Sequence, residues 1–138
     1  MSSQNDNVDL TILLPTYNEA LTIQNMLEAI RINIPDDTIY EIIIVDDDSP
    51  DGTNEIANSY FEKLENIIKH NVHVRKNKRG LSSAVIDGMK IACGKYVLVM
   101  DSDFSHPPEM IRKMYSKITN DDLDIVIGSR YIKGGKFE

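Results

Sequence analysis

The sequence predicts an α/β protein with a mostly parallel sheet that helices cover on both faces. Continuous blocks of Val, Ile and Leu alternate along the chain with segments in which apolar residues recur every three or four positions. The blocks lack the polar alternation of a half-exposed strand, which is typical of parallel strands buried on both faces. A length of 138 residues suits one domain of this kind.

The first half of the chain contains two strand–helix units. LTILLP (10–15) is the first apolar block, and a helix is expected from Glu19 to about Ile34, where Pro35 ends the pattern. EIIIVD (41–46) is the second block. After the turn DSPDGT, apolar residues at helical spacing predict a helix over Asn54–Ile68.

The second half continues the alternation. VHV (72–74) predicts a short strand, a basic loop follows, and helical spacing resumes from Leu81 to Ala92. YVLVMD (96–101) is the most apolar block of all. In HPPEMIRKMYSKI (106–118) the prolines indicate a helix start, where a missing N–H costs nothing, and DIVIGS (124–129) is expected as a closing strand.

The two ends of the chain differ from its middle. Residues 1–8 are polar, and we expect a disordered tail that precedes a single domain over 9–138. The last residues, KGGKFE, follow an apolar stretch with no closing helix or strand. We therefore expect the C-terminal part of the domain to be missing from this chain.

The charge and composition favour some partners over others. A formal net charge of −7 argues against a surface that binds nucleic acid, although it allows a local basic pocket. The single cysteine and the absence of a basic-then-apolar signal segment favour a reducing, intracellular setting. No apolar run approaches the roughly 18 to 20 residues that a membrane-spanning helix needs.

Charged motifs gather where the expected strands end. The five motifs are PTYNE, DDDSPDGT, RKNKRGL, DSDFSHPP and GSRY. In open parallel sheets, ligands bind beyond the carboxyl ends of the strands, so these motifs mark the expected site. Carboxylates that cluster at one sheet edge repel one another unless a cation or a set of hydrogen-bond donors neutralises them.

The aspartates of DSDFSHPP are the candidate metal ligands. Asp101 and Asp103 stand one residue apart at a strand end, and their hard carboxylate oxygens suit Mg²⁺ or Mn²⁺. The alternative is a solvated turn in which Asp103 caps the following helix. For His106, a structural or solvent-facing role is favoured over metal binding.

Two other motifs offer both ligand-binding and structural interpretations. Residues 66–86 contain five basic side chains and no acid, which suits phosphate binding beside Gly80, although such a run can also be a solvated loop. In the DDD motif, one aspartate is expected to point into the sheet edge while others bind a base or ribose. Alternatively, Asp48 or Ser49 caps the next helix.

Taken in order and spacing, five motifs resemble the family 2 glycosyltransferases of Rossmann-like GT-A fold, and most closely the polyprenol-phosphate (dolichol-phosphate) mannose synthases. They are PTYNE, IVDDDSPDGT, RGLSSAVIDGM, VMDSDFSHPPE and IGSRYIKGG, and the resemblance covers residues 9–136. No GxGxxG follows the first strand and no phosphate-binding GxxxxGK[ST] loop is present, so dinucleotide-binding and P-loop functions are not favoured.

The resemblance implies a role for each candidate residue. Nucleotide contacts fall on Pro15, Tyr17, Glu19, Val45, Asp47, Arg79 and Ser102. Asp101 and Asp103 would bind the metal and the diphosphate, with Ser105 as a weaker third ligand. Arg130 matches an arginine that contacts phosphate, and together with the two aspartates it forms the expected catalytic set.

The activity implied is inverting transfer of mannose from GDP-mannose to a polyprenyl (dolichyl) phosphate with a divalent metal. The full-length protein is then expected in the cytoplasm or at the cytoplasmic face of the membrane. Two alternatives stay open. One is another family 2 enzyme, with a UDP-glucose donor or a hydroxyl acceptor, and the other is a domain that binds nucleotide sugars without activity.

Overall fold

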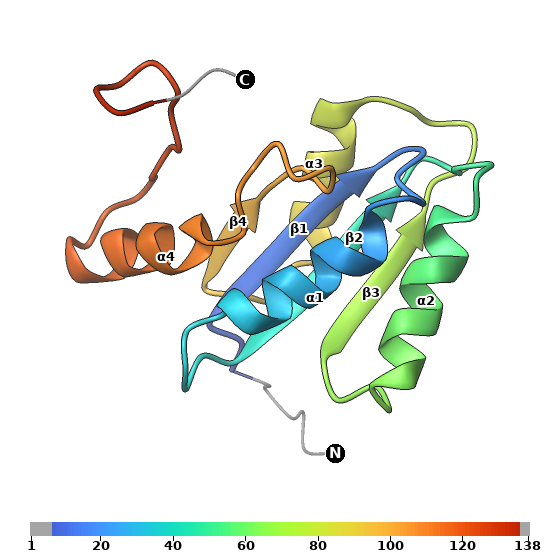
Figure 1. Ribbon diagram of the computed structural model, residues 1–138, viewed down its shortest axis with the longest axis horizontal. Coiled ribbons are helices and arrows are strands. Elements are labelled where there is room, and N and C mark those ends of the chain that lie inside the picture. Colours follow the sequence, from blue (N-terminus) through green and yellow to red (C-terminus); the bar gives the residue numbers. More distant parts are fainter. Residues whose placement is uncertain (1–6, 136–138) are drawn as a thin grey trace.

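A computed structural model describes residues 7–135, which form an open parallel sheet of four strands (Figure 1). The strand order is β3-β2-β1-β4, and every pairing is parallel. The strands are β1 (Leu10–Thr16), β2 (Tyr40–Asp46), β3 (Lys69–Val74) and β4 (Tyr96–Val99). The reversal of strand order between β1 and β4 places the first loop at a position where such sheets bind ligands.

Four helices of equal length cover the two faces of the sheet. They are α1 (Ile23–Asn33), α2 (Thr53–Lys63), α3 (Leu81–Ile91) and α4 (Met110–Asn120). In Figure 1, α1 and α2 lie in front of the sheet and α3 lies behind it. The prediction of helices on both faces of a parallel sheet is therefore confirmed.

Alternate residues of each central strand supply two apolar cores. Ile12 and Leu14 of β1 join the larger core with α1 and α2, whereas Leu13 faces α3 in a smaller core. All three side chains are fully buried. A strand buried on both faces shows no polar alternation, which explains the continuous apolar blocks of the sequence.

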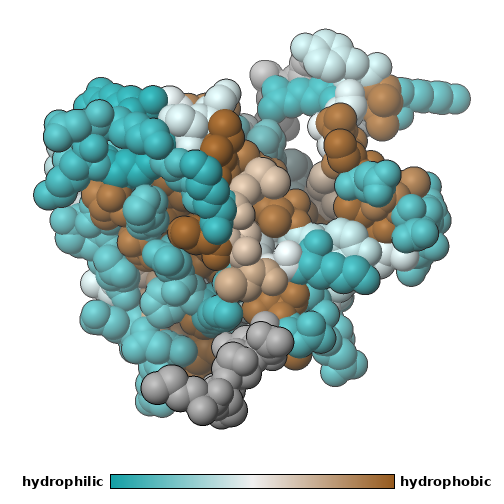
Figure 2. All heavy atoms as spheres, turned by 180° about the vertical axis from the view of Figure 1, so that it is seen from behind, coloured by the Kyte–Doolittle hydropathy of each residue, from teal (hydrophilic) through white to brown (hydrophobic). Residues whose placement is uncertain are grey.

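The back of the molecule carries exposed apolar side chains. Leu81, Ile86 and Met89 of α3 are each more than half exposed. Figure 2 shows this face, where apolar atoms (brown) lie among the polar ones. α3 thus turns only its small residues, Ala84 and Gly88, fully toward the sheet.

The observed helices and strands are displaced by a few residues from the expected ones. α1 and α2 are shorter than predicted, β3 begins three residues earlier, and β4 ends two residues earlier. α4 begins at Met110, because Pro107 and Pro108 form the preceding turn and accept hydrogen bonds from the N–H groups of Met110 and Ile111 (both 3.0 Å). Apolar spacing locates a helix but not the hydrogen bond at which it ends.

The predicted closing strand over 124–129 is wrong for the chain that the structure describes. These residues form no strand, and Ile125 and Ile127 are 74% and 78% exposed. α4 leads the chain away from β4, as Figure 1 shows, so the segment does not reach the free edge of that strand. An apolar pattern records a tendency toward burial, whereas a strand also requires a backbone partner.

The expected disordered tail falls mostly on residues 1–6, which lie outside the described residues. At its end, Val8 is buried, and its carbonyl accepts a hydrogen bond from the N–H of Lys95 (3.0 Å). The ordered domain therefore includes Val8, because this residue pairs with the chain entering β4. Within residues 7–135, no helix has the length and apolar character that crossing a membrane requires.

Candidate active site

The carboxyl ends of the strands bring four loops to one edge of the sheet. Backbone pairing continues past the strand ends: the N–H of Asp47 donates to Thr16 (3.0 Å) and the N–H of Arg75 donates to Asp46 (2.8 Å). The loops after β1, β2 and β3 are thus held in register before they diverge. All the charged motifs of these loops begin within a residue or two of that fixed edge.

Asp46 organises the end of β2 from within the protein. Its carboxylate accepts hydrogen bonds from the hydroxyls of Thr16 (2.7 Å) and Ser49 (2.6 Å), and from the N–H of Ser49 (2.9 Å). The residue is fully buried. Asp46 is therefore the aspartate of DDD that points into the sheet edge, as the sequence predicted.

The alternative in which Asp48 or Ser49 caps α2 is wrong. α2 begins at Thr53 with Gly52 as its N-cap, and the cap makes no side-chain hydrogen bond. The hydroxyl of Ser49 accepts a hydrogen bond from the N–H of Asn18 instead (2.9 Å). The residue thus joins two loops and does not close a helix end.

Further contacts fix the loop after β1 against the start of α2. The N–H of Glu19 donates to the hydroxyl of Thr53 (2.9 Å). The N–H of Ala20 donates to the carboxylate of Asp51 (3.1 Å). These bonds hold Glu19, a candidate nucleotide contact, at the carboxyl edge.

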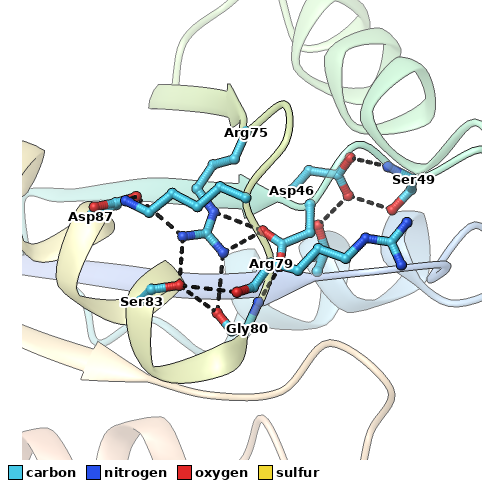
Figure 3. A network of polar contacts seen from close by, with 10 residues as sticks. Asp46, Ser49, Arg75, Arg79, Gly80, Ser83 and Asp87 are labelled. Atoms are coloured by element: carbon cyan, nitrogen blue, oxygen red, sulfur yellow. Dashed lines mark hydrogen bonds and ion pairs between the residues drawn. The ribbon is translucent and has the colours of Figure 1, made fainter.

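Asp47 is held by the chain that follows β3 (Figure 3). Nε of Arg75 donates to one carboxylate oxygen of Asp47 (2.7 Å), and the N–H of Gly80 donates to the other (3.0 Å). Arg75 is 4% exposed. This arginine therefore belongs neither to a solvated loop nor to an open phosphate-binding surface, the two roles that the basic run suggested.

Arg79 and Tyr17 meet at the same edge, although they lie far apart in the sequence. The guanidinium carbon of Arg79 stands 4.7 Å from the centre of the Tyr17 ring, which is a cation–π contact. Tyr17 is 40% exposed. The structure thus brings together two of the expected nucleotide contacts on an accessible aromatic surface.

Acidic side chains concentrate beside this surface. Burial and the negative charges of Asp103 and Asp101 raise the pKa of Glu19 above its usual value. The contribution of the two aspartates to this shift means that the carboxylates repel one another across the edge. A cation bound among them would relieve that repulsion.

Ser105 joins the two candidate metal ligands. Its hydroxyl lies 2.6 Å from an oxygen of Asp103 and 3.3 Å from an oxygen of Asp101. Hydrogen bonds from the hydroxyl and the N–H of Ser105 lower the pKa of Asp103, so that carboxylate stays ionised. The alternative in which Asp103 caps α4 is wrong, since the helix begins seven residues later.

His106 contacts the first of the two aspartates. Its Nδ1 accepts a hydrogen bond from the N–H of Asp101 (2.9 Å), and its Nε2 lies 3.6 Å from an Asp101 carboxylate oxygen. An Nδ1 that accepts from a backbone N–H carries no proton. The contact therefore agrees with the structural role that the sequence favoured for His106.

The carboxylate oxygens at this edge suit a divalent cation that is also bound by water or substrate. Among residues 7–135, no group of three or more His, Cys, Asp or Glu side chains is arranged to hold a metal alone. Mg²⁺ commonly needs only one or two protein carboxylates, because water and substrate phosphates complete its shell. Asp101 and Asp103, held on either side of one hydroxyl, meet that requirement for Mg²⁺ or Mn²⁺.

Arg130 lies against the loop that carries the two aspartates. Its Nη2 is 3.4 Å from the carbonyl oxygen of Ser105. Both residues line a hollow of about 980 Å³ between the end of β4, α4 and residues 128–135. Lys113 and Lys133 also line it. The sequence did not single out Lys113, because a basic residue within an amphipathic helix is normally solvated.

Of the three other candidate residues, two have almost no accessible side chain. Pro15 and Val45 pair across β1 and β2, and Val45 is fully buried. Ser102 is 1% exposed. A nucleotide contact at Val45 or Ser102 would therefore be made by the main chain.

Comparison with known proteins identifies the family of this fold and site. Residues 11–138 match the family described as glycosyl transferase family 2. The chain belongs to this family. The match spans all four described strands except the first residue of β1, and it contains every candidate residue of the edge.

Known relatives and solved structures agree with this assignment. The family 2 chain is 45% identical over 129 residues to a dolichol-phosphate mannosyltransferase of Pyrococcus furiosus, covering 94% of the chain and 35% of the relative. It resembles a mannosyltransferase from Pyrobaculum calidifontis solved with GDP-Man and Mn²⁺, at 28% identity and a TM-score of 0.61. That match covers 70% of this chain and 28% of the other.

A second solved structure contains a different nucleotide sugar. The chain resembles TarS of S. aureus in complex with UDP-GlcNAc, at 25% identity and a TM-score of 0.64, over 83% of this chain and 32% of that one. The predicted Rossmann-like GT-A fold is confirmed by these neighbours. The chain spans about a third of the length of each protein named here.

Proposed function

We propose that this chain binds GDP-mannose and that the whole protein transfers the mannosyl group to a polyprenyl phosphate. The observation that carries the proposal is the gathering of Asp101, Asp103, Arg130, Arg79 and Tyr17 at one sheet edge. This set offers an aromatic surface for a base, carboxylates for a metal and cations for phosphate. The similarity to a dolichol-phosphate mannosyltransferase supports the choice of donor and acceptor.

The donor's diphosphate is expected beside the aspartate pair. Asp101 and Asp103 would hold Mg²⁺ or Mn²⁺ there, and the low pKa of Asp103 keeps its carboxylate charged for that task. When bound, a divalent cation neutralises the negative charge that develops on the leaving diphosphate. The similar mannosyltransferase solved with GDP-Man and Mn²⁺ supports this choice of metal.

The chemical step needs no strong general base. An oxygen of the lipid phosphate forms a bond to the anomeric carbon while the bond from that carbon to the diphosphate oxygen breaks. The electron pair of the broken bond leaves with GDP, and the sugar's configuration inverts. A phosphate oxygen is already ionised at neutral pH, so no proton has to be removed from the nucleophile. Arg130 contributes positive charge near the reacting phosphates.

The hollow beside Arg130 supports an amphiphilic phosphate as acceptor. Phe104, Met114 and Ile132 give it apolar walls, while Lys113 and Lys133 add positive charge to that of Arg130. Apolar walls suit a prenyl chain, and cations suit its phosphate. A water-soluble donor and a lipid acceptor meet at a membrane surface, and we propose the cytoplasmic face for the whole protein.

A donor panel tests this function. GDP-mannose, UDP-glucose and UDP-GlcNAc are each offered to the whole protein with polyprenyl phosphate and Mn²⁺, and labelled lipid product is counted. We expect transfer from GDP-mannose to exceed transfer from either UDP sugar. Faster transfer from a UDP sugar would favour the second candidate, a UDP-sugar transferase, which the fold similarity to TarS supports.

A further inference from the structure

Arg75 sits at the centre of a polar network that joins three parts of the fold (Figure 3). Its Nη1 donates to Ser83 (2.9 Å) and to Asp87 (3.2 Å) in α3. Its Nη2 donates to the carbonyl of Gly80 (3.1 Å) and lies 2.6 Å from Asp47 at the end of β2. With the Nε bond to Asp47, the guanidinium makes four hydrogen bonds and an ion pair, so each of its three nitrogens contacts protein oxygens.

In this arrangement Arg75 cannot donate a hydrogen bond to a ligand directly. Its side chain is 2% exposed, and every guanidinium nitrogen already contacts a protein oxygen. A nucleotide could reach the guanidinium only by displacing Asp47 or Gly80. Any influence of Arg75 on ligand binding therefore passes through the residues that it holds.

The residues held by Arg75 are those that face the candidate nucleotide site. Asp47 receives Arg75 on one oxygen and the N–H of Gly80 on the other, so its carboxylate is fixed in one orientation. Gly80 is bound at both its N–H and its carbonyl, and it has a φ of 121° that favours glycine. The preceding residue, Arg79, is thereby set over the ring of Tyr17.

We propose that Arg75 and Asp87 are positioning residues, which fix Asp47 and the Arg79–Gly80 segment in the geometry that the donor nucleotide requires. The proposal rests on the proposed function, since it assumes a nucleotide at this edge. Asp87 takes part because its carboxylate accepts a hydrogen bond from Nη1 (3.2 Å) and so holds the guanidinium on the side of α3. Lys78 covers Asp87 on its outer side (2.8 Å).

The location of the network supports a role in the site. None of its polar residues belongs to either apolar core, and it lies where the chain leaves β2 and β3 for α3. Hydrogen bonds from Lys78 and then from Arg75 lower the pKa of Asp87, so its carboxylate stays ionised. The two basic and two acidic side chains of the network neutralise one another. They can therefore fix the position of the loop without adding net charge near a bound diphosphate.

A double-mutant cycle tests the proposal. Asp47→Asn, Arg75→Lys and the double variant are compared with the parent by calorimetry with GDP and Mn²⁺. Lys keeps the charge of Arg75 but not its planar fork. We expect each single change to weaken GDP binding about tenfold, and the double variant to bind within about twofold of Asp47→Asn alone.

Two further measurements separate positioning from general damage to the fold. Mn²⁺ with inorganic pyrophosphate probes only the metal side, so Arg75→Lys should leave pyrophosphate affinity within about twofold of the parent. Asp87→Asn, a nearly isosteric change, should weaken GDP binding in the same selective way even if Arg75→Lys fails to fold. Arg31→Lys is the matched control, because Arg31 makes a comparable ion pair with Glu28 on the exposed surface.

The outcomes distinguish this inference from the function on which it rests. A parent chain that binds neither GDP nor any UDP nucleotide would overturn the proposed function and this inference with it. If the parent binds GDP but the losses multiply in the double variant, Arg75 acts independently of Asp47 and the positioning role is wrong. Equal losses of GDP and pyrophosphate affinity in Arg75→Lys and in Asp87→Asn would likewise contradict it.

Discussion

Ser102 stands between the two candidate metal ligands with its hydroxyl sealed from solvent. Within residues 7–135, this hydroxyl is the one buried side-chain polar atom that has no hydrogen-bond partner. An unsatisfied buried hydroxyl costs roughly 1 to 3 kcal/mol of stability. The Ser102 hydroxyl therefore does not stabilise the fold, and alanine at this position would lose no favourable contact.

We predict that Ser102→Ala raises the free energy of unfolding by about 1 kcal/mol, because it removes the unsatisfied group. GDP affinity should stay within about twofold of the parent, since any nucleotide contact at this position comes from the main chain. Urea unfolding and GDP calorimetry on the same preparation measure both effects. A large loss of GDP affinity at unchanged stability would show that the hydroxyl turns toward the ligand.

At this scale, the sequence predicted which residues reach the edge but not what they contact there. Asp101 and Asp103 were found because two carboxylates at a strand end are a local pattern. The basic run that contains Arg75 suggested either phosphate binding or a solvated loop, yet the structure buries Arg75 against Asp47 and Asp87. A long side chain contacts residues that are distant in the sequence, and a local sequence pattern does not show which residues these are.

α3 packs closely against the sheet at Gly88. A Cβ built on this glycine would lie 2.2 Å from a methyl carbon of Leu13, which is fully buried in β1. Real side chains do not approach so closely, so Leu13 or the helix would have to move. Gly88 therefore sets the distance between α3 and the sheet.

Gly88→Ala should lower the free energy of unfolding by about 1 to 3 kcal/mol, the usual cost of overpacking a well-packed contact. Alanine would otherwise favour the helix by up to about 1 kcal/mol. Chemical denaturation of Gly88→Ala beside Ser82→Ala, an exposed change in the same helix, measures the difference. A Gly88→Ala variant as stable as the control would mean that Leu13 moves aside at no cost.

α1 and α2 are joined by a surface contact that depends on pH. Glu28 of α1 accepts hydrogen bonds from Arg31 (3.0 Å) and from the hydroxyl of Tyr60 in α2 (2.6 Å). These bonds lower the pKa of Glu28 from 4.5 to about 2. A carboxyl whose pKa falls on folding stabilises the fold above its unfolded pKa and loses that contribution as pH drops through the folded value.

We expect Glu28→Gln to be less stable than the parent at pH 6 by about 0.2 to 1 kcal/mol, a small amount because the ion pair is exposed. The difference should shrink between the unfolded value of 4.5 and the folded value of about 2, as the parent's own carboxylate becomes protonated. Unfolding curves for both proteins at pH 6, 4 and 2.5 measure it. A difference that is constant across this range would contradict the assignment.

The helices and strands themselves could be predicted in kind, because buried parallel strands and amphipathic helices have distinct apolar spacing. Their ends could not be predicted as well. α2 was expected to reach Ile68, but Glu65 and Asn66 both have positive φ and end the helical run earlier. The turn ends the helix although the apolar pattern continues to Ile68. The pattern alone does not show which of the two preferences is stronger.

The molecule as a whole combines an acidic surface with an edge where cations meet carboxylates. The net charge of −7 would repel a diphosphate at long range. Local positive charge from Arg79 and Arg130, together with a bound divalent cation, has to overcome that repulsion. Nucleotide affinity should therefore depend strongly on the metal.

Topology was the part of the whole fold that local patterns left open. The alternation of strands and helices predicted a parallel sheet, and the order β3-β2-β1-β4 follows once each crossover is placed. The segment 124–129 has the composition of a fifth strand but remains exposed. Whether an apolar segment joins a sheet depends on the direction of the preceding helix. Amino-acid composition does not determine that direction.

Metal-dependent GDP binding tests the central claim most directly. The chain and its Asp103→Ala variant are titrated with GDP in Mn²⁺ and again in EDTA, with Asp36→Ala as a control, since Asp36 is an exposed aspartate preceding β2. The account predicts that Mn²⁺ tightens GDP binding by about tenfold or more in the parent and the control. Asp103→Ala should melt at the parent's temperature, because Asp103 is exposed, yet show no Mn²⁺ effect. Equal Mn²⁺-dependent affinity in Asp103→Ala and the parent would contradict the account.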